Sequence, residues 1–193
     1  MPSPANRPIH LALMLVLLIL TACGEDPAPR SAPSPADPAA LVTLPAIKLK
    51  IPSVYSPGTV LLQESLSEFN DGRYRAARNG IETFLREHGK SPERLYARYA
   101  LALTHLYELH RGSADSTVAD TPAATAVARD LMQRLIDGKA TKDMREKLNY
   151  FMGVAWLMDG EAGKALVYFE RCVNFRGPLR ERAETAVRAI GNL

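Results

Sequence analysis

The chain has 193 residues, of which 47% are apolar, 23% charged and 7% aromatic, a composition that suits one folded domain and excludes disorder throughout. The formal net charge is only +3 and no basic run stands out, which argues against nucleic acid as a partner. The two cysteines form no Cys-x-x-Cys pair, so a disulfide framework, a zinc site and a dithiol redox motif are excluded.

Residues 1–22 have the pattern of an export signal. A leader with one arginine and no acidic residue precedes ten consecutive apolar residues, Leu11 to Leu20. A ten-residue helix is about 15 Å long, half of what a membrane span needs, so the run predicts a cleaved signal peptide. The sequence Leu20-Thr21-Ala22-Cys23 then resembles the lipobox of bacterial lipoproteins. That resemblance implies that Cys23 carries diacylglycerol; the alternative is an ordinary secretory signal with a chance cysteine.

The lipoprotein resemblance also implies a location. Gly24 follows Cys23, whereas an aspartate in that position is the best-known signal for retention in the inner membrane of enteric bacteria. The resemblance therefore implies that the protein is anchored in the outer membrane and faces the periplasm. More than one acyl chain, such as an added palmitate, is expected on it, because a single chain binds a bilayer only marginally.

Residues 23–58 are expected to form a lipidated tether between the membrane and the folded domain. Eight of the 14 prolines lie between Pro27 and Pro57, and large apolar residues are too few there to offset the entropy of ordering. The stretch from Leu41 to Ile51 is more apolar. It is either a locally sticky part of the linker or an extended strand that lies against the domain or against a partner.

Residues 59–193 have the pattern of seven helices and no strand. Apolar residues recur with the helical period, Asp-Gly turns interrupt them, and two Ser/Thr-Pro pairs have the form of a helix start. The expected helices are Val60–Phe69, Tyr74–Glu87, Ser91–His110, Thr121–Asp137, Thr141–Met158, one that follows Gly160 and ends near Phe175, and Leu179–Ile190.

The sequence repeats itself at an offset of 88 residues. Asp71-Gly72, Ala77, Ile81 and Phe84 coincide with Asp159-Gly160, Ala165, Phe169 and Cys172. Together with Gly153 and Trp156, this pattern resembles the tetratricopeptide repeat, a helix pair of 34 residues in which small residues let the backbones approach. Residues 59–193 are thereby expected to form an all-helical solenoid with a capping last helix; the alternative is a generic array of helical hairpins.

Two of the three copies depart from the repeat pattern. In the first copy, Ser65 stands where glycine or alanine is usual. In the middle copy, the stretch Arg111–Asp120 is inserted between the two helices.

No pattern in the chain predicts catalysis. His88, His105 and His110 lack the i, i+4 spacing and the carboxylate of a helical metal site, and there is no nucleophile elbow or phosphate-binding glycine loop. Cys172 falls where the repeat places a small buried residue, which predicts an inert core thiol. We therefore expect no enzyme activity, no metal, no cofactor and no small-molecule substrate.

The resemblance to tetratricopeptide repeats implies a concave face, lined by the first helix of each pair, that binds an envelope protein or a peptide segment. Family spacing places nine residues on or beside this groove: Arg94, Ala97, Leu101, Thr104, His105, Lys147, Tyr150, Val154 and Leu157. Each of them has the alternative of merely covering a neighbouring helix. The expected function is a scaffold or adaptor for an envelope complex; the alternative is a pilotin or assembly factor that escorts a secretin, a pilus protein or a barrel protein.

Overall fold

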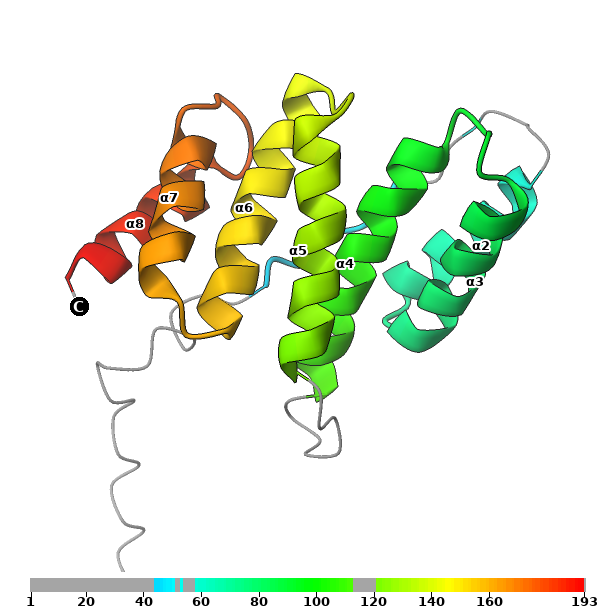
Figure 1. The fold of residues 1–193 in the computed structure, drawn as a ribbon, viewed down its shortest axis with the longest axis horizontal. Coiled ribbons are helices and arrows are strands. Elements are labelled where there is room, and N and C mark those ends of the chain that lie inside the picture. Colours follow the sequence, from blue (N-terminus) through cyan, green and yellow to red (C-terminus); the bar gives the residue numbers. More distant parts are fainter. Residues whose placement is uncertain (1–43, 51–52, 54–57, 113–120, 193) are drawn as a thin grey trace, which may run out of the picture. The chain divides into compact units, whose positions relative to one another are not determined.

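A computed structural model describes residues 44–50, 53, 58–112 and 121–192 of the chain. These residues contain seven helices and no strand, as the sequence pattern predicts (Figure 1). The helices are α2 (Thr59–Asn70), α3 (Tyr74–Glu87), α4 (Arg94–Gly112), α5 (Thr121–Asp137), α6 (Lys142–Met158), α7 (Ala162–Val173) and α8 (Arg180–Gly191). The predicted signal peptide, Cys23 and most of the predicted tether lie outside the described residues.

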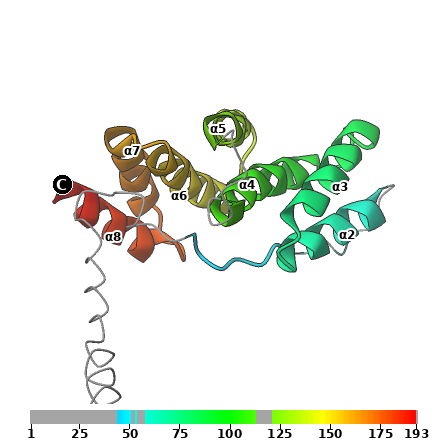
Figure 2. The same cartoon turned by 90° about the horizontal axis from the view of Figure 1, so that it is seen from below.

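The helices pack in the order in which they follow one another in the chain. Every consecutive pair from α2 and α3 to α7 and α8 is in contact, and α4 also touches α2 and α6. Figure 2 shows α5 on one side of α4, with the non-helical residues 44–50 passing on the other side. One face of α4 is thus covered by residues 44–50, which precede the helices in the sequence, and not by another helix.

The start of α4 differs from its predicted position. The Ser91-Pro92 pair predicts a helix from residue 91, but residues 91–93 form a turn in which the Arg94 N–H donates to the Ser91 carbonyl at 3.2 Å. The Ser91 hydroxyl bonds to the carboxylate of Glu93, and the first helical hydrogen bond runs from Ala97 N–H to the Glu93 carbonyl at 2.8 Å. The other predicted helix limits agree with the structure to within two residues.

The sequence repeat at an offset of 88 residues corresponds to two turns with the same backbone conformation. Gly72 and Gly160 have φ angles of +77° and +76°. The residues before them, Asp71 and Asp159, end α2 and α6 with φ and ψ of −90° and 1° and of −89° and 2°. Glycine adopts a positive φ without steric cost, so the two Asp-Gly pairs end the first helices of two hairpins in the same way.

Small residues decide how closely the paired helices approach. A Cβ added to Gly153 of α6 would lie 2.7 to 2.9 Å from three ring carbons of Phe169 on α7, so this glycine makes room for the ring. Between α2 and α3 the small residue is on the other helix, because Gly80 of α3 accommodates the Ser65 side chain. The Ser65 hydroxyl donates to the Leu61 carbonyl at 2.7 Å, which explains why serine is tolerated at this position.

A carboxylate of α6 holds the start of α8. The buried Glu146 accepts a hydrogen bond from the Leu179 N–H at 3.0 Å through its Oε1 atom. A negative charge stabilises the N-terminal end of a helix, where the backbone N–H groups lack partners. Gly177 fits beside this carboxylate because any Cβ there would overlap it.

The apolar core is continuous through all the described helices, with fully buried Ile81, Leu103, Phe151 and Phe169 among its largest members. None of the described helices is both long enough and apolar enough to span a bilayer.

Candidate functional site

A segment of the chain lies on α4 in the manner of a bound peptide. This docked segment, Leu44–Lys50, has no regular secondary structure. The side chain of Asn70, the last residue of α2, forms two hydrogen bonds with the main chain of this segment. The Asn70 Oδ1 atom accepts from the Leu49 N–H at 2.7 Å, and its Nδ2 atom donates to the Leu49 carbonyl at 3.0 Å.

Two tyrosines of α4 hold the segment's main chain on either side of this contact. The Tyr107 hydroxyl donates to the Pro45 carbonyl, and the main chain of Lys50 forms a hydrogen bond with the Tyr96 hydroxyl. Burial raises the pKa of both phenols, although the bond from Lys50 acts in the opposite direction on the pKa of Tyr96. Both hydroxyls therefore stay protonated at neutral pH. We call Asn70, Tyr96 and Tyr107 the docking face.

Alternate side chains of the docked segment point toward the helices. From Pro45 onward, Pro45 and Leu49 are buried and Ile47 is partly buried against the core, whereas Ala46, Lys48 and Lys50 are exposed. Leu44, at the start of the segment, is also partly buried against the core. Leu49 retains only 5% of its accessible surface. A period of two is what an extended chain with one buried face requires. Residues 44–50, the described part of the Leu41–Ile51 stretch, thus lie as an extended chain against the domain, which is one of the placements that the sequence leaves open.

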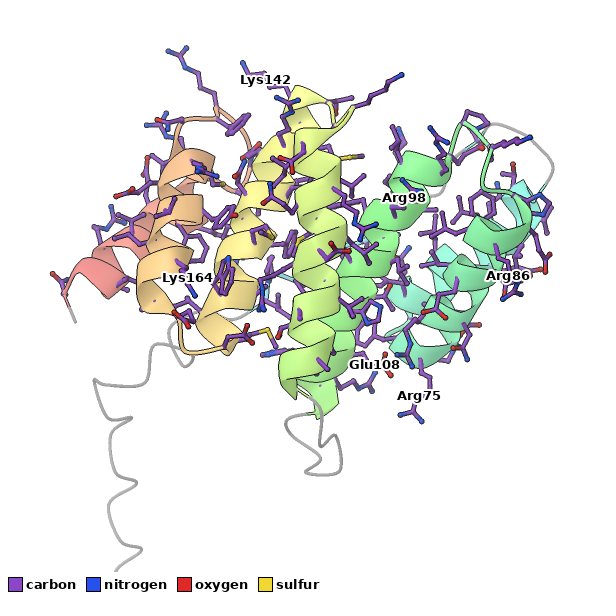
Figure 3. The ribbon with its side chains drawn as sticks, in the orientation of Figure 1. Arg75, Arg86, Arg98, Glu108, Lys142 and Lys164 are labelled. Carbon is purple, nitrogen blue, oxygen red and sulfur yellow. The ribbon has the colours of Figure 1, made fainter. Side chains whose placement is uncertain are left out.

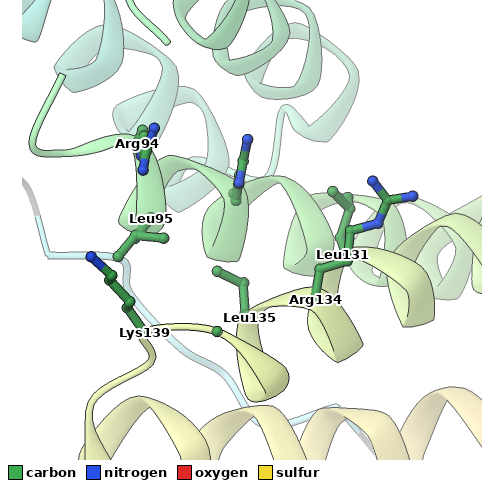
Figure 4. A pocket seen from close by; sticks show the side chains of 8 residues that line it. Arg94, Leu95, Leu131, Arg134, Leu135 and Lys139 are labelled. Carbon is green, nitrogen blue, oxygen red and sulfur yellow. The ribbon is translucent and has the colours of Figure 1, made fainter. Parts of the chain in front are cut away.

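Apart from the docking face, a cavity lies between the start of α4 and the end of α5 (Figure 4). It is a cavity of about 360 Å³ with an apolar floor of three leucines and a rim of four basic residues: Arg94, Leu95, Arg98, Leu131, Arg134, Leu135, Gly138 and Lys139. Figure 3 shows Arg98, one of these basic residues, on α4. In the described part of the chain, Arg134 pairs with Asp130 at 2.9 Å, and no carboxylate lies within 4 Å of the other three cations.

The predicted groove residues of α4 do not share one open surface. Arg94 is exposed on the rim of the cavity, but Ala97, Leu101 and Thr104 are buried, as is His105. Ala97 is shifted by one residue from Tyr96, and Leu101 and Thr104 lie on the same face of the helix as Ala97. Since each residue turns a helix by about 100°, this shift moves the predicted face roughly a quarter turn away from the docking face.

His105 lies toward α3 and not in a groove. Burial and the Arg78 guanidinium lower the pKa of His105, while Glu82 and Glu108 oppose that effect. Glu108 also pairs with Arg75 and Arg78 of α3 at 3.4 Å, and the first of these pairs can be followed in Figure 3. The surroundings of His105 are therefore a packed α3–α4 contact.

The predicted groove residues of α6 are also mostly internal. Tyr150, Val154 and Leu157 are each 2% exposed, and the Tyr150 ring packs edge-on against Phe169 at 5.6 Å. Lys147 is partly exposed and pairs with Asp143 at 2.8 Å. For Tyr150, Val154 and Leu157 the structure corresponds to the alternative of helix-covering residues, because a buried side chain offers a partner no surface in this conformation.

The potentially reactive side chains Cys172 and His88 are packed against other residues of the domain. Cys172 is a buried free thiol, and burial, with a further contribution from Glu146, raises its pKa to about 12. A thiol with that pKa carries almost no thiolate at neutral pH. The ring of His88 packs against Gly58 and Phe84. No cluster of three or more metal-ligating side chains occurs in the residues that the structure describes.

A cluster of charged and aromatic side chains joins α5, α6 and α7. Arg129 of α5 pairs with Asp159 and stacks over the Trp156 ring at 4.0 Å. Lys164 of α7 lies 4.6 Å from the same ring, and Figure 3 shows it beside α6. The side chains of Arg129 and Asp159 are only 17% and 15% exposed, whereas Lys164 is exposed, so this cluster joins α5, α6 and α7 mainly through its buried ion pair.

Comparison with protein-family models, with curated proteins and with solved structures gives no match for this chain. The function must therefore be inferred from the residues themselves. Sequence reasoning missed all three residues of the docking face. The alternation of apolar residues from Pro45 to Leu49 and the tyrosines of α4, spaced by 11 positions on one helical face, were the available signals.

Proposed function

We propose that this protein is a lipid-anchored adaptor of the bacterial envelope that binds extended segments of other proteins on the docking face. The observation that carries the proposal is the docked segment itself, which Asn70, Tyr96 and Tyr107 hold through its main chain. Every polypeptide has these main-chain groups. A face that binds them is suited to a peptide ligand rather than to one small molecule.

The helical architecture supports the same proposal. Consecutively packed helix pairs, here with a turn that recurs at an offset of 88 residues, are the scaffold from which tetratricopeptide-like solenoids build long binding surfaces. We propose that α2 through α8 form such a repeat domain. The described residues supply tyrosine hydroxyls, an amide and apolar side chains to the docked segment, and these groups bind peptides without a chemical step.

The envelope location rests on the export signal and on Cys23. In this proposal, lipid at Cys23 holds the domain next to a membrane and raises the effective concentration of whatever it binds there. Radiolabelled palmitate fed to expressing cells tests the anchor, with Cys23→Ser as the control. Label on the wild-type protein alone supports it, and equal label on both proteins refutes it.

Site-specific photo-crosslinking in cells tests the binding face. A benzoylphenylalanine replaces either Tyr96 on the docking face or Tyr168 on α7, which is also partly buried and bonds to Gln133 within the stack. We expect one discrete adduct with another polypeptide from position 96 and none from position 168. A stable one-to-one adduct fits an adaptor, whereas a transient client fits the escort alternative. Equal adducts from both positions, or none from 96, would refute the proposed face.

A further inference from the structure

The docked segment occupies the face that the proposed function assigns to a partner. Its hold combines the paired hydrogen bonds from Asn70, the bonds to Tyr96 and Tyr107, and burial of apolar side chains at alternate positions. We propose that Leu44–Lys50 is an intramolecular competitor. A partner binds by displacing it, with an extended segment that has apolar residues at three alternate positions. This inference rests on the proposed function and adds the partner's chemistry and its regulation.

The chemistry of the contacts defines what the partner must share with the segment. All the hydrogen bonds from the docking face go to the main chain at Pro45, Leu49 and Lys50, so they read no side chain. From Pro45 onward the side chains that point inward are Pro45, Ile47 and Leu49, and Leu44 before them is also partly buried against the core. A partner therefore needs apolar groups at positions i, i+2 and i+4 of an extended stretch, while the residues between them are free to vary.

The two exposed lysines of the segment indicate that the docking face does not select a partner by charge. Lys48 and Lys50 point away from the helices, and no ion pair of either lysine is found among the described residues. Recognition of the segment is therefore apolar and main-chain directed. The basic rim of the cavity between α4 and α5 takes no part in it.

Competition within one chain has a measurable consequence. A tethered segment acts at an effective concentration in the millimolar range, and a ligand that binds only the open fraction of a protein has its apparent Kd raised by the inverse of that fraction. If the face is open about a tenth of the time, a free peptide binds about tenfold more weakly than it would to a permanently open face.

Two adjacent residues provide a matched pair of variants for this test. Leu49→Ser removes a buried side chain of the segment, and Lys48→Ser makes the same replacement at an exposed position. The probe is a fluorescein-labelled peptide with the sequence LPAIKLK, and the control peptide, LPASKSK, has serine at the second and third apolar positions. Binding is measured by fluorescence anisotropy on the full chain, and circular dichroism checks that each variant keeps its helices.

We expect Leu49→Ser to bind the LPAIKLK probe about tenfold or more tightly than wild type, Lys48→Ser to match wild type, and LPASKSK to bind none of them. Adding Asn70→Ala to Leu49→Ser should reverse the gain, because it removes the paired bonds to the peptide main chain. Hydrogen exchange on the wild-type protein gives a second readout that needs no substitution. Excess LPAIKLK should speed exchange of the Leu49 amide while the helices stay protected.

Three results would overturn the inference. Equal, tight binding to wild type and Leu49→Ser would mean that the segment does not compete, and would leave the proposed peptide-binding function intact. A Leu49 amide whose exchange does not respond to bound peptide would mean the same. Absence of binding to both proteins would show that the face does not take such a segment in trans, and the crosslinking at Tyr96 then decides the proposed function separately.

Discussion

The close packing of Gly153 of α6 against Phe169 of α7 allows a quantitative test. In Gly153→Ala the new methyl group would lie 2.7 to 2.9 Å from the ring of Phe169, which is fully buried and also packed against Tyr150. The ring therefore has little room to move. Overpacking of this kind costs about 1–3 kcal/mol, and the gain in helix propensity returns about 1 kcal/mol. The expected net loss is therefore up to about 2 kcal/mol, or up to roughly 8 °C in Tm.

Gly163→Ala on α7 is the matched control, because a Cβ there meets nothing within 4 Å. It should leave stability unchanged or raise it by up to about 1 kcal/mol. Thermal and urea unfolding of both variants check the pair. Combining Gly153→Ala with Phe169→Leu should cost less than the sum of the single changes, since the smaller side chain relieves the clash. The packing argument is wrong if Gly153→Ala proves as stable as Gly163→Ala.

Three further predictions concern other buried groups. Gly177→Ala should cost about 1–3 kcal/mol in urea unfolding, because its Cβ would push the Glu146 carboxylate away from the start of α8; an unchanged midpoint would contradict that role. Burial and Arg78 lower the pKa of His105 in the folded state, so its contribution to stability is present above about pH 6.5 and is lost as the pH falls through the lowered pKa. Tm against pH should then be flatter below about pH 6.5 in His105→Gln than in wild type, and parallel curves would refute the assignment. Cys172, with a pKa of about 12, should resist iodoacetamide in the native protein and react only after unfolding; rapid native labelling would show that the thiol is accessible.

Local sequence signals predicted the helices because the forces that make them are local. Apolar residues recurred with the helical period, and Asp-Gly pairs ended α2 and α6 where glycine permits a positive φ. The start of α4 was predicted three residues early, because the Ser91 hydroxyl donates a hydrogen bond to the Glu93 carboxylate within a turn that precedes the helix. The same Ser-Pro pattern is compatible with a turn and with a first helical turn, and only the fold distinguishes them.

The candidate site could not be predicted in the same way, because its parts are far apart in the sequence. Asn70 acts on a residue 21 positions earlier and Tyr107 on one 62 positions earlier, and neither pairing has a local signature. The predicted groove on α4 lies on a face of that helix about 100° from the docking face, which is a shift of one residue. The basic rim at Arg94 and Lys139 likewise exists only because α5 returns to the start of α4.

The two proposals, taken together, couple partner binding to distance from the membrane. The docked segment begins at Leu44, 21 residues after Cys23, whereas α2 begins at Thr59, a further 15 residues along the chain. While the segment is bound, those 15 residues cannot extend the tether. At about 3.1 Å per residue for a polyproline-like chain, displacement by a partner releases up to roughly 45 Å of additional reach. An adaptor built in this way would let its captured partner reach farther from the bilayer once the segment is displaced, whereas a tether without affinity for the domain would gain no reach on binding.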